Sequence, residues 1–109
     1  MRFSVPSSEA QTIRQHGHSE RRNAIKIAYL HHELYRYSVV ISKKQGTAPQ
    51  RNYIKRYIRS IMQKNEKNYP RGSYLIFYTD HSKAFDRAEC EKSIASIMKK
   101  ITHKAENTK

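Results

Sequence analysis

The chain has 109 residues, with 22 Lys and Arg against nine Asp and Glu, so its formal net charge is +13. That length suits a single domain with a core of its own. One cysteine excludes an internal disulfide framework and a cysteine-based zinc site, and no apolar run approaches the roughly 18 residues of a membrane span. Residues 1–6 lack the apolar stretch of a signal peptide. We therefore expect a small cytoplasmic polycation, whose charge favours nucleic acid over an anionic membrane surface as partner.

The distribution of charge is more specific than its sum. No acidic residue lies between Leu34 and Asn65, and the same window carries eight cations: Arg36, Lys43, Lys44, Arg51, Lys55, Arg56, Arg59 and Lys64. A solvated structural surface normally mixes both signs of charge. The window therefore predicts a surface that faces phosphates.

Three elements are predicted in the first 42 residues. A short helix is expected over 9–16, with Ser7 or Ser8 as its N-cap. Residues 23–30 and 35–42 show the β-branched and aromatic composition and the alternation of strands.

Three more elements follow in the second half. Pro49 introduces a helix over 48–65, residues 73–79 form an apolar run that predicts a central strand, and a last helix is expected over 86–100. The apolar stripes of the two helices are Ile54, Tyr57, Ile58, Ile61 and Met62, then Cys90, Ile94, Ile97, Met98 and Ile101. This order of elements predicts an α/β layer with both long helices on one sheet face. The other face needs the N-terminal helix or a ligand to cover it.

The helix over 48–65 presents a second, charged face. Arg51, Lys55 and Arg59 are spaced at i, i+4 and i+8, with Arg56 beside them. A guanidinium forks onto a phosphate, and cations one turn apart can follow successive phosphates, although a merely solvated face is the alternative. Asn52 either donates to RNA or fixes the junction between loop and helix. Gly46 is expected to allow a positive φ in the preceding turn.

A resemblance to a known family rests on residues 42–59, SKKQGTAPQRNYIKRYIR. Their pattern, S-K-K-x-G-x-A followed by R-N-x-x-K-R-x-x-R, resembles the signature of the bacterial ribonuclease P protein subunit. The order of elements is also similar, and so is the Glu-Lys-Ser-Ile segment at 91–94. The resemblance covers about residues 10 to 101.

The resemblance implies a fold and a domain organisation. The fold would be an α/β (α+β) two-layer sandwich with a small mixed sheet. A left-handed β-α-β crossover, a rare exception to the usual hand, would surround the signature helix. One domain would occupy 1–109, with an ordered core at about 7–102 and a flexible tail at 103–109.

The resemblance also implies a function. The chain would be the non-catalytic, RNA-binding protein component of an endoribonuclease ribonucleoprotein that removes the 5′ leader from precursor tRNA. Its partners would be the ribonuclease P RNA subunit and precursor tRNA, with no membrane or DNA partner. The RNA would carry out the hydrolysis and the ribonucleoprotein would require Mg²⁺, while the protein itself would hold no catalytic residue, no metal and no cofactor.

Two sets of binding residues follow from the resemblance. The RNA-binding set is Lys43, Lys44, Arg51, Asn52, Tyr53, Lys55, Arg56 and Arg59. The candidates for a leader cleft between the sheet and the first helix are Arg14, Arg36, Tyr35 and Tyr37. The family commonly has Arg where this chain has Tyr53, and Phe at the positions of Ala10 and Arg14. Tyr53 is therefore expected to stack on a base or a ribose. Binding of the leader in the cleft is expected to depend more on charge than on stacking against aromatic rings.

The tyrosines of the strands allow two interpretations. Tyr35 and Tyr37 share one face of a strand, as do Tyr74 and Tyr78. Each ring either fills the core or forms part of a stacking platform in the leader cleft. We expect Phe77 to be core, and the six histidines to lie on the surface without a metal.

Two functions from other classes stay open. The chain could be a structural RNA-binding protein of the ribosomal type, which would bind RNA without enhancing precursor cleavage. It could also be a small protein-only endoribonuclease, which would need a general base among its own side chains. The spacing of the signature favours the ribonuclease P subunit.

Overall fold

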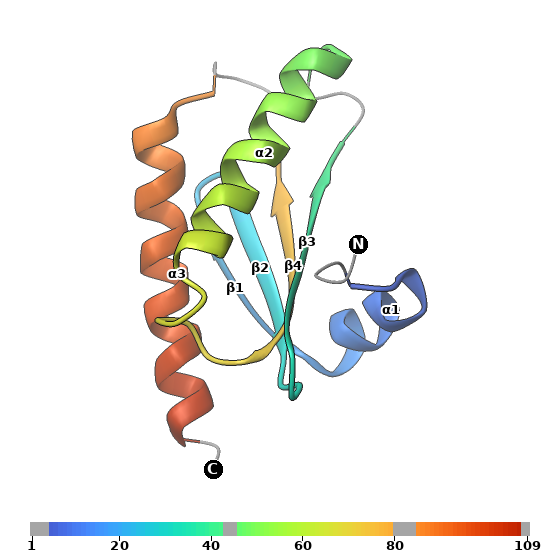
Figure 1. The fold of residues 1–109 in the computed structure, drawn as a ribbon, viewed down its shortest axis with the longest axis vertical. Helices are drawn as coiled ribbons and strands as arrows, with labels where there is room; N and C mark the ends of the chain where they lie inside the picture. The colour runs from blue at the N-terminus through green and yellow to red at the C-terminus, as the bar shows by residue number, and fades with distance from the viewer. Residues whose placement is uncertain (1–4, 43–45, 80–84, 108–109) are drawn as a thin grey trace.

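The computed structural model describes residues 5–42, 46–79 and 85–107. In chain order its elements are α1 (Ser7–His16), β1 (His18–Arg22), β2 (Ile25–Leu30), β3 (Tyr35–Ile41), α2 (Ala48–Lys64), β4 (Gly72–Tyr78) and α3 (Arg87–Asn107) (Figure 1). The four strands form one sheet in the order β1-β2-β4-β3, in which β3 runs parallel to β4 and the other neighbours are antiparallel. Across the described ranges, no helix combines the length and apolar character that a membrane span needs.

The six predicted elements are all present, and β4 lies inside the sheet as expected. The sequence interpretation missed β1, whose residues His-Ser-Glu-Arg-Arg show no apolar alternation. This edge strand forms because a tight turn at Asn23, which adopts a positive φ of 54°, folds it back onto β2. Asparagine tolerates that conformation better than most residues.

Two helix ends differ from expectation. Neither Ser7 nor Ser8 caps α1, because the helix begins after Pro6, whose carbonyl accepts from the Glu9 and Ala10 amides. The last helix continues to Asn107, so residues 103–107, expected as part of a flexible tail, are helical.

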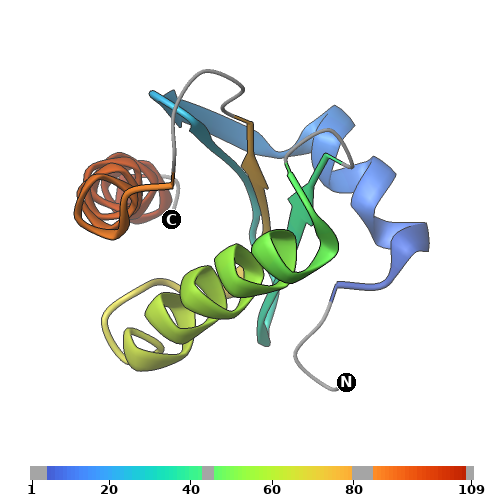
Figure 2. The same ribbon diagram turned by 90° about the horizontal axis from the view of Figure 1, so that it is seen from above.

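The two long helices cover one face of the sheet and α1 covers the other, as Figure 2 shows from above. Alternate strand residues face opposite sides, so each strand contributes to two clusters. The larger, on the α2 and α3 side, includes Ile25, Ile27, Tyr74 and Ile76 from the sheet with the apolar stripes of both helices. The smaller, beneath α1, consists of Val5, Ile13, Ala28 and Leu75. Every residue of the two predicted stripes is buried except Tyr57, which is half-buried.

The connection from β3 through α2 to β4 is left-handed. In Figure 1 both strands point upward, α2 lies in front of the sheet, and β4 lies to the left of β3. Nearly all parallel crossovers have the opposite hand. The crossover implied by the resemblance is therefore confirmed, and it places the start of α2 beside the ends of β3 and β4.

Candidate RNA-binding surface

The start of α2 is built around a capping box. The Thr47 hydroxyl accepts from the Gln50 amide at 3.4 Å, and the Gln50 side chain accepts from the Thr47 amide at 2.9 Å. Gly46 precedes the box with a φ of 101°, and a Cβ there would collide with the Gln50 side-chain oxygen. The expected role of Gly46 in the turn is confirmed.

The cations of α2 differ in how far they are exposed. Arg56 and Arg59 are exposed, whereas Arg51 and Lys55 are half-buried. Arg51 also donates from Nη1 to the Gly46 carbonyl at 2.7 Å, so it supports the turn as well as carrying charge. Lys55, Arg56 and Arg59 form no ion pair with any residue in the described ranges. Their charge is available to an external anion.

Asn52 and Tyr53 complete the part of the predicted RNA-binding set that the structure describes. Asn52 is exposed, and its side chain makes no hydrogen bond to any described residue. That observation favours a role toward a ligand over a role in fixing the junction. Tyr53 is 49% exposed and rests edge-to-face on Phe85. Lys43 and Lys44 lie outside the described residues.

A second basic surface lies on the opposite face of the sheet, beside α1. The register aligns one residue from each strand: Arg21 with Lys26, Lys26 with Phe77, and Phe77 with Val40. We call Arg21, Lys26, Phe77 and Val40 the sheet row. Val40 is 39% exposed and Phe77 is half-buried, so the row is open to solvent.

Two cations lie over the ring of Phe77. The Arg14 guanidinium carbon lies 5.1 Å from the ring centroid, and the Lys26 ammonium nitrogen lies 5.8 Å from it. Both distances fall within the range of a cation–π contact. The sheet row with Arg14 thus combines an aromatic face with positive charge, as surfaces for single-stranded nucleic acid do.

Three of the four leader-cleft candidates do not line the sheet row. Arg36 is buried at 8% exposure and forms an ion pair with Glu9 on α1, so its guanidinium is occupied. The hydrogen bond from Arg36 holds the pKa of the Glu9 carboxyl below its ordinary value. Tyr35 and Tyr37 face α2 and α3, and the Tyr35 hydroxyl donates to the Met62 carbonyl at 2.6 Å. Only Arg14 borders the sheet row.

The tyrosines of the strands therefore belong to the core side of the sheet, and the half-buried Phe77 lies on the side of α1. Tyr35, Tyr74 and Tyr78 are buried in the larger cluster, and Tyr37 packs against it. The prediction that Phe77 is core was wrong in part, since it is half-buried, only packs against the smaller cluster and lies beneath the Arg14 guanidinium. Because Phe77 and Tyr78 are neighbours on β4, the sequence indicated that their side chains lie on opposite faces of the sheet. It did not indicate how little of the Phe77 face α1 would cover.

Comparison with known proteins agrees with this geometry. A family model described as Ribonuclease P matches residues 6–102. The chain belongs to the ribonuclease P protein family. The resemblance inferred from residues 42–59 is thereby confirmed, and most of these residues lie in α2.

Individual relatives of the ribonuclease P family support the same assignment. The ribonuclease P protein component of Petrotoga mobilis is 31% identical over an alignment of 71 residues, which covers 61% of this chain and 60% of that relative. The match thus spans less than two thirds of the relative's length. The Staphylococcus aureus RNase P protein has a TM-score of 0.80 at 21% identity, covering 89% of this chain and 93% of that one. The Thermotoga maritima protein has a TM-score of 0.78 at 18% identity, covering 89% and 96%. The two solved structures show that the fold is shared.

Proposed function

We propose that this chain is the protein subunit of ribonuclease P and assists a catalytic RNA in removing the 5′ leader from precursor tRNA in the cytoplasm. The observation that carries the proposal is the family match over 6–102 together with an acid-free α2, whose exposed Arg56 and Arg59 form no ion pair with any described residue. In this proposal the protein binds and positions the RNA subunit and the precursor tRNA, and the catalytic RNA and its metal ions carry out the hydrolysis.

The α2 surface is proposed to bind the RNA subunit. Arg56 and Arg59 are exposed on a helix that holds no Asp or Glu, and Lys55 adds a third cation. An RNA backbone laid along this helix would release counterions at each neutralised phosphate. Asn52, at the first turn, supplies a donor for a base edge or sugar.

The sheet row is proposed to bind the single-stranded leader. Phe77 offers one ring face, and Arg14, Lys26 and Arg21 surround it with positive charge. One ring and three cations favour contacts to successive phosphates with a single stacked base. We therefore expect sequence-tolerant binding of the leader.

The Mg²⁺ that the family implies is assigned to the RNA. Among the described residues, no group of three His, Cys, Asp or Glu side chains is placed to hold a metal ion.

The test is cleavage of precursor tRNA by a bacterial ribonuclease P RNA at low magnesium, with and without the protein, beside a protein-only control. The proposal expects strong stimulation by the protein and no cleavage by the protein alone. Cleavage without RNA would place the chemistry on these side chains and indicate a protein-only endoribonuclease. Tight RNA binding without stimulation would indicate a structural RNA-binding protein.

A second measurement separates the two surfaces. The reconstituted enzyme is compared on precursors with a long leader and with a one-nucleotide leader. Phe77→Leu combined with Lys26→Gln should weaken binding of the long-leader substrate and leave the short-leader substrate unchanged, because only the former reaches the sheet row. Lys92→Gln, which removes an exposed α3 cation, is the control. Equal losses on both substrates would contradict the assignment of the leader to this row.

A further inference from the structure

Helix α2 lies beside β3, an edge strand of the sheet (Figure 2). Among the described elements, the backbone of α2 comes close to β3 and to α3 and to no other. In the strand order β1-β2-β4-β3, β3 has a neighbour on one side only, and no described strand covers its outer edge. The side chains of α2 are therefore divided between a side that faces α3 and a side that faces β3.

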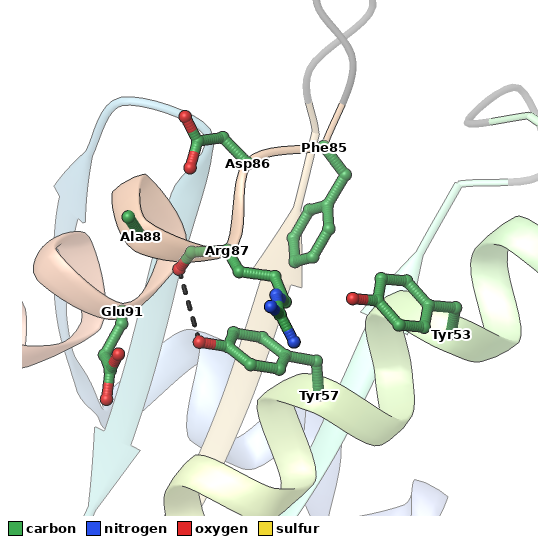
Figure 3. A pocket seen from close by; sticks show the side chains of 7 residues that line it. All are labelled: Tyr53, Tyr57, Phe85, Asp86, Arg87, Ala88 and Glu91. Atoms are coloured by element: carbon green, nitrogen blue, oxygen red, sulfur yellow. Dashed lines mark hydrogen bonds between the residues drawn. The ribbon is translucent and has the colours of Figure 1, made fainter.

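The side of α2 that faces α3 carries Tyr53 and Tyr57. The Tyr57 hydroxyl donates to the Arg87 carbonyl at 3.4 Å, and the Arg87 guanidinium carbon lies 5.9 Å from the Tyr57 ring centroid (Figure 3). Phe85 packs edge-to-face against both tyrosines, with centroid distances of 5.8 Å. This side of the helix is thus in contact with the start of α3.

The other side of α2 carries cations toward β3. Near the end of the helix, the Met62 carbonyl accepts from the Tyr35 hydroxyl of β3 at 2.6 Å. With about 3.6 residues per turn, Arg51, Lys55 and Arg59 project on the same side of the helix as Met62. Arg51 and Lys55 are half-buried, as expected of side chains that lie against a neighbouring element.

Tyr37 lies level with Arg59. On β3 it follows Tyr35 by two residues, a rise of about 6.6 Å, and so faces the same side of the sheet. Helix α2 runs in the opposite direction to β3, and one turn of it rises about 5.4 Å (Figure 1). One step along β3 from the contact between Tyr35 and Met62 therefore corresponds to one turn back along α2, which is the turn that contains Arg59.

The Tyr37 hydroxyl and the Arg59 guanidinium are hydrogen-bond donors with no hydrogen bond or ion pair to any residue that the structure describes. Tyr37 is half-buried, and its ring is fixed edge-to-face against Tyr35 at 5.6 Å. Burial raises the pKa of the Tyr37 hydroxyl, and so does the Glu66 carboxylate, whereas the Arg59 guanidinium lowers it. The hydroxyl therefore stays protonated at neutral pH, and Arg59 lies close enough for its charge to act on it.

A phosphate suits this pair of donors, because its oxygens accept several hydrogen bonds and carry the opposite charge to a guanidinium. Neither β3 nor α2 contains an acidic residue that would compete. We propose that an RNA phosphate binds between Arg59 on α2 and Tyr37 on β3, so that the bound RNA follows the side of α2 that faces β3. This inference rests on the proposed RNA-binding function and adds a contact from the sheet to it. Glu66 limits the site, because a carboxylate repels a phosphate.

The experiment measures the affinity of the full chain for a bacterial ribonuclease P RNA over a range of salt concentrations. Tyr37→Phe removes the hydroxyl and keeps the ring against Tyr35, and circular dichroism checks that the variant folds. We expect its affinity to fall about three- to tenfold, the effect of one hydrogen bond. The slope of log K against log salt should not change, because a neutral hydroxyl releases no counterion. Arg59→Gln should lower both the affinity and the slope.

A double-mutant cycle tests whether the two side chains share one phosphate. Tyr37→Phe should cost little in the Arg59→Gln background, because the phosphate is no longer held beside the hydroxyl. It should cost as much in the Arg56→Gln background as in the wild type, because Arg56 lies further round the helix, away from β3. Tyr35→Phe is the matched control. It removes the hydroxyl that donates to the Met62 carbonyl, so it should lower the urea midpoint and leave the RNA affinity unchanged.

Three results would overturn the phosphate site. They are an unchanged affinity of Tyr37→Phe, an equal loss from Tyr37→Phe in the wild-type and Arg59→Gln backgrounds, and weaker binding by Glu66→Gln, which should bind more tightly because it no longer repels the phosphate. Coupling between Tyr37 and Arg59 without stimulation of precursor cleavage would leave the site standing and remove the proposed function. Stimulation without coupling would remove only the site. A wild-type protein that binds no RNA would remove both.

Discussion

Arg36 on β3 and Glu9 on α1 form a two-pronged ion pair that ties α1 to the sheet. Nη1 of Arg36 donates to Oε2 of Glu9 at 3.3 Å, and Nη2 donates to Oε1 of Glu9 and, at 2.9 Å, to the Ser73 hydroxyl on β4. Arg36 is buried, and its Nε has no hydrogen-bond partner among the described residues. The pair therefore orients α1, and with it Arg14, over the sheet row.

Replacing only one partner of this ion pair should destabilise the protein. Glu9→Gln leaves the buried guanidinium without its counter-charge, so we expect a lower urea midpoint. Replacing both partners, with Glu9→Gln and Arg36→Met, should recover much of the loss, because no unpaired buried charge remains. Urea unfolding of the two single variants and the double variant gives the coupling. Additive effects would show that the two side chains act independently.

The same pair should make stability depend on acid pH. Arg36 lowers the folded-state pKa of Glu9, with a smaller contribution from His32, so the stabilisation is complete above the unfolded-state pKa and is lost as the pH falls through the lowered value. Urea midpoints at neutral pH and at about pH 3 should therefore drop more for the wild type than for Glu9→Gln. Parallel pH profiles for the two proteins would argue against the assignment.

Gly46→Ala should destabilise the start of α2. The positive φ strains any residue with a Cβ, and the added methyl group displaces the Gln50 side chain from the capping box. We expect these two effects together to lower the free energy of unfolding by about 1–3 kcal/mol. Thr47→Ser, which keeps the capping hydroxyl, is the matched control and should be close to neutral. A neutral Gly46→Ala would mean that the turn can relax.

Arg56→Gln combined with Arg59→Gln should weaken binding to the ribonuclease P RNA and reduce its dependence on salt. Both side chains are exposed, so folding should be unaffected. Each lost phosphate contact removes about 0.7–0.9 from the slope of log K against log salt, so two contacts remove roughly 1.5. Lys92→Gln with Lys99→Gln removes the same charge from α3 and should change the slope little. Equal effects of the two pairs would indicate binding to net charge alone.

The signature residues were predictable because their signal is local. The proline in the first turn of α2, the positive φ of Gly46 and the spacing of Arg51, Lys55 and Arg59 involve neighbours within a few turns of chain. The missed strand β1 shows the limit of such signals. His18–Arg22 carries no apolar alternation, and forms a strand only through its pairing with β2.

The cleft residues were not predictable in the same way. The alternation of β3 separates Arg36 from Tyr35 and Tyr37, but it does not say which face α1 will cover. Likewise, no short stretch of sequence indicates that Arg36 will form an ion pair with Glu9, 27 positions earlier. For these reasons the sequence left Tyr35 and Tyr37 open between the core and the leader cleft, and the structure places both on the core side of the sheet.

The sequence by itself determined every described element except β1, together with the signature helix, the excess of positive charge and the family, because each depends on residue types at short spacing. Only the tertiary structure decided which side chains meet. The strand order β1-β2-β4-β3 brings Lys26 and Val40 to either side of Phe77, and the left-handed crossover sets Tyr53 against Phe85. The physical reason is that contacts between distant segments depend on how the layers pack, which no short stretch of the chain encodes.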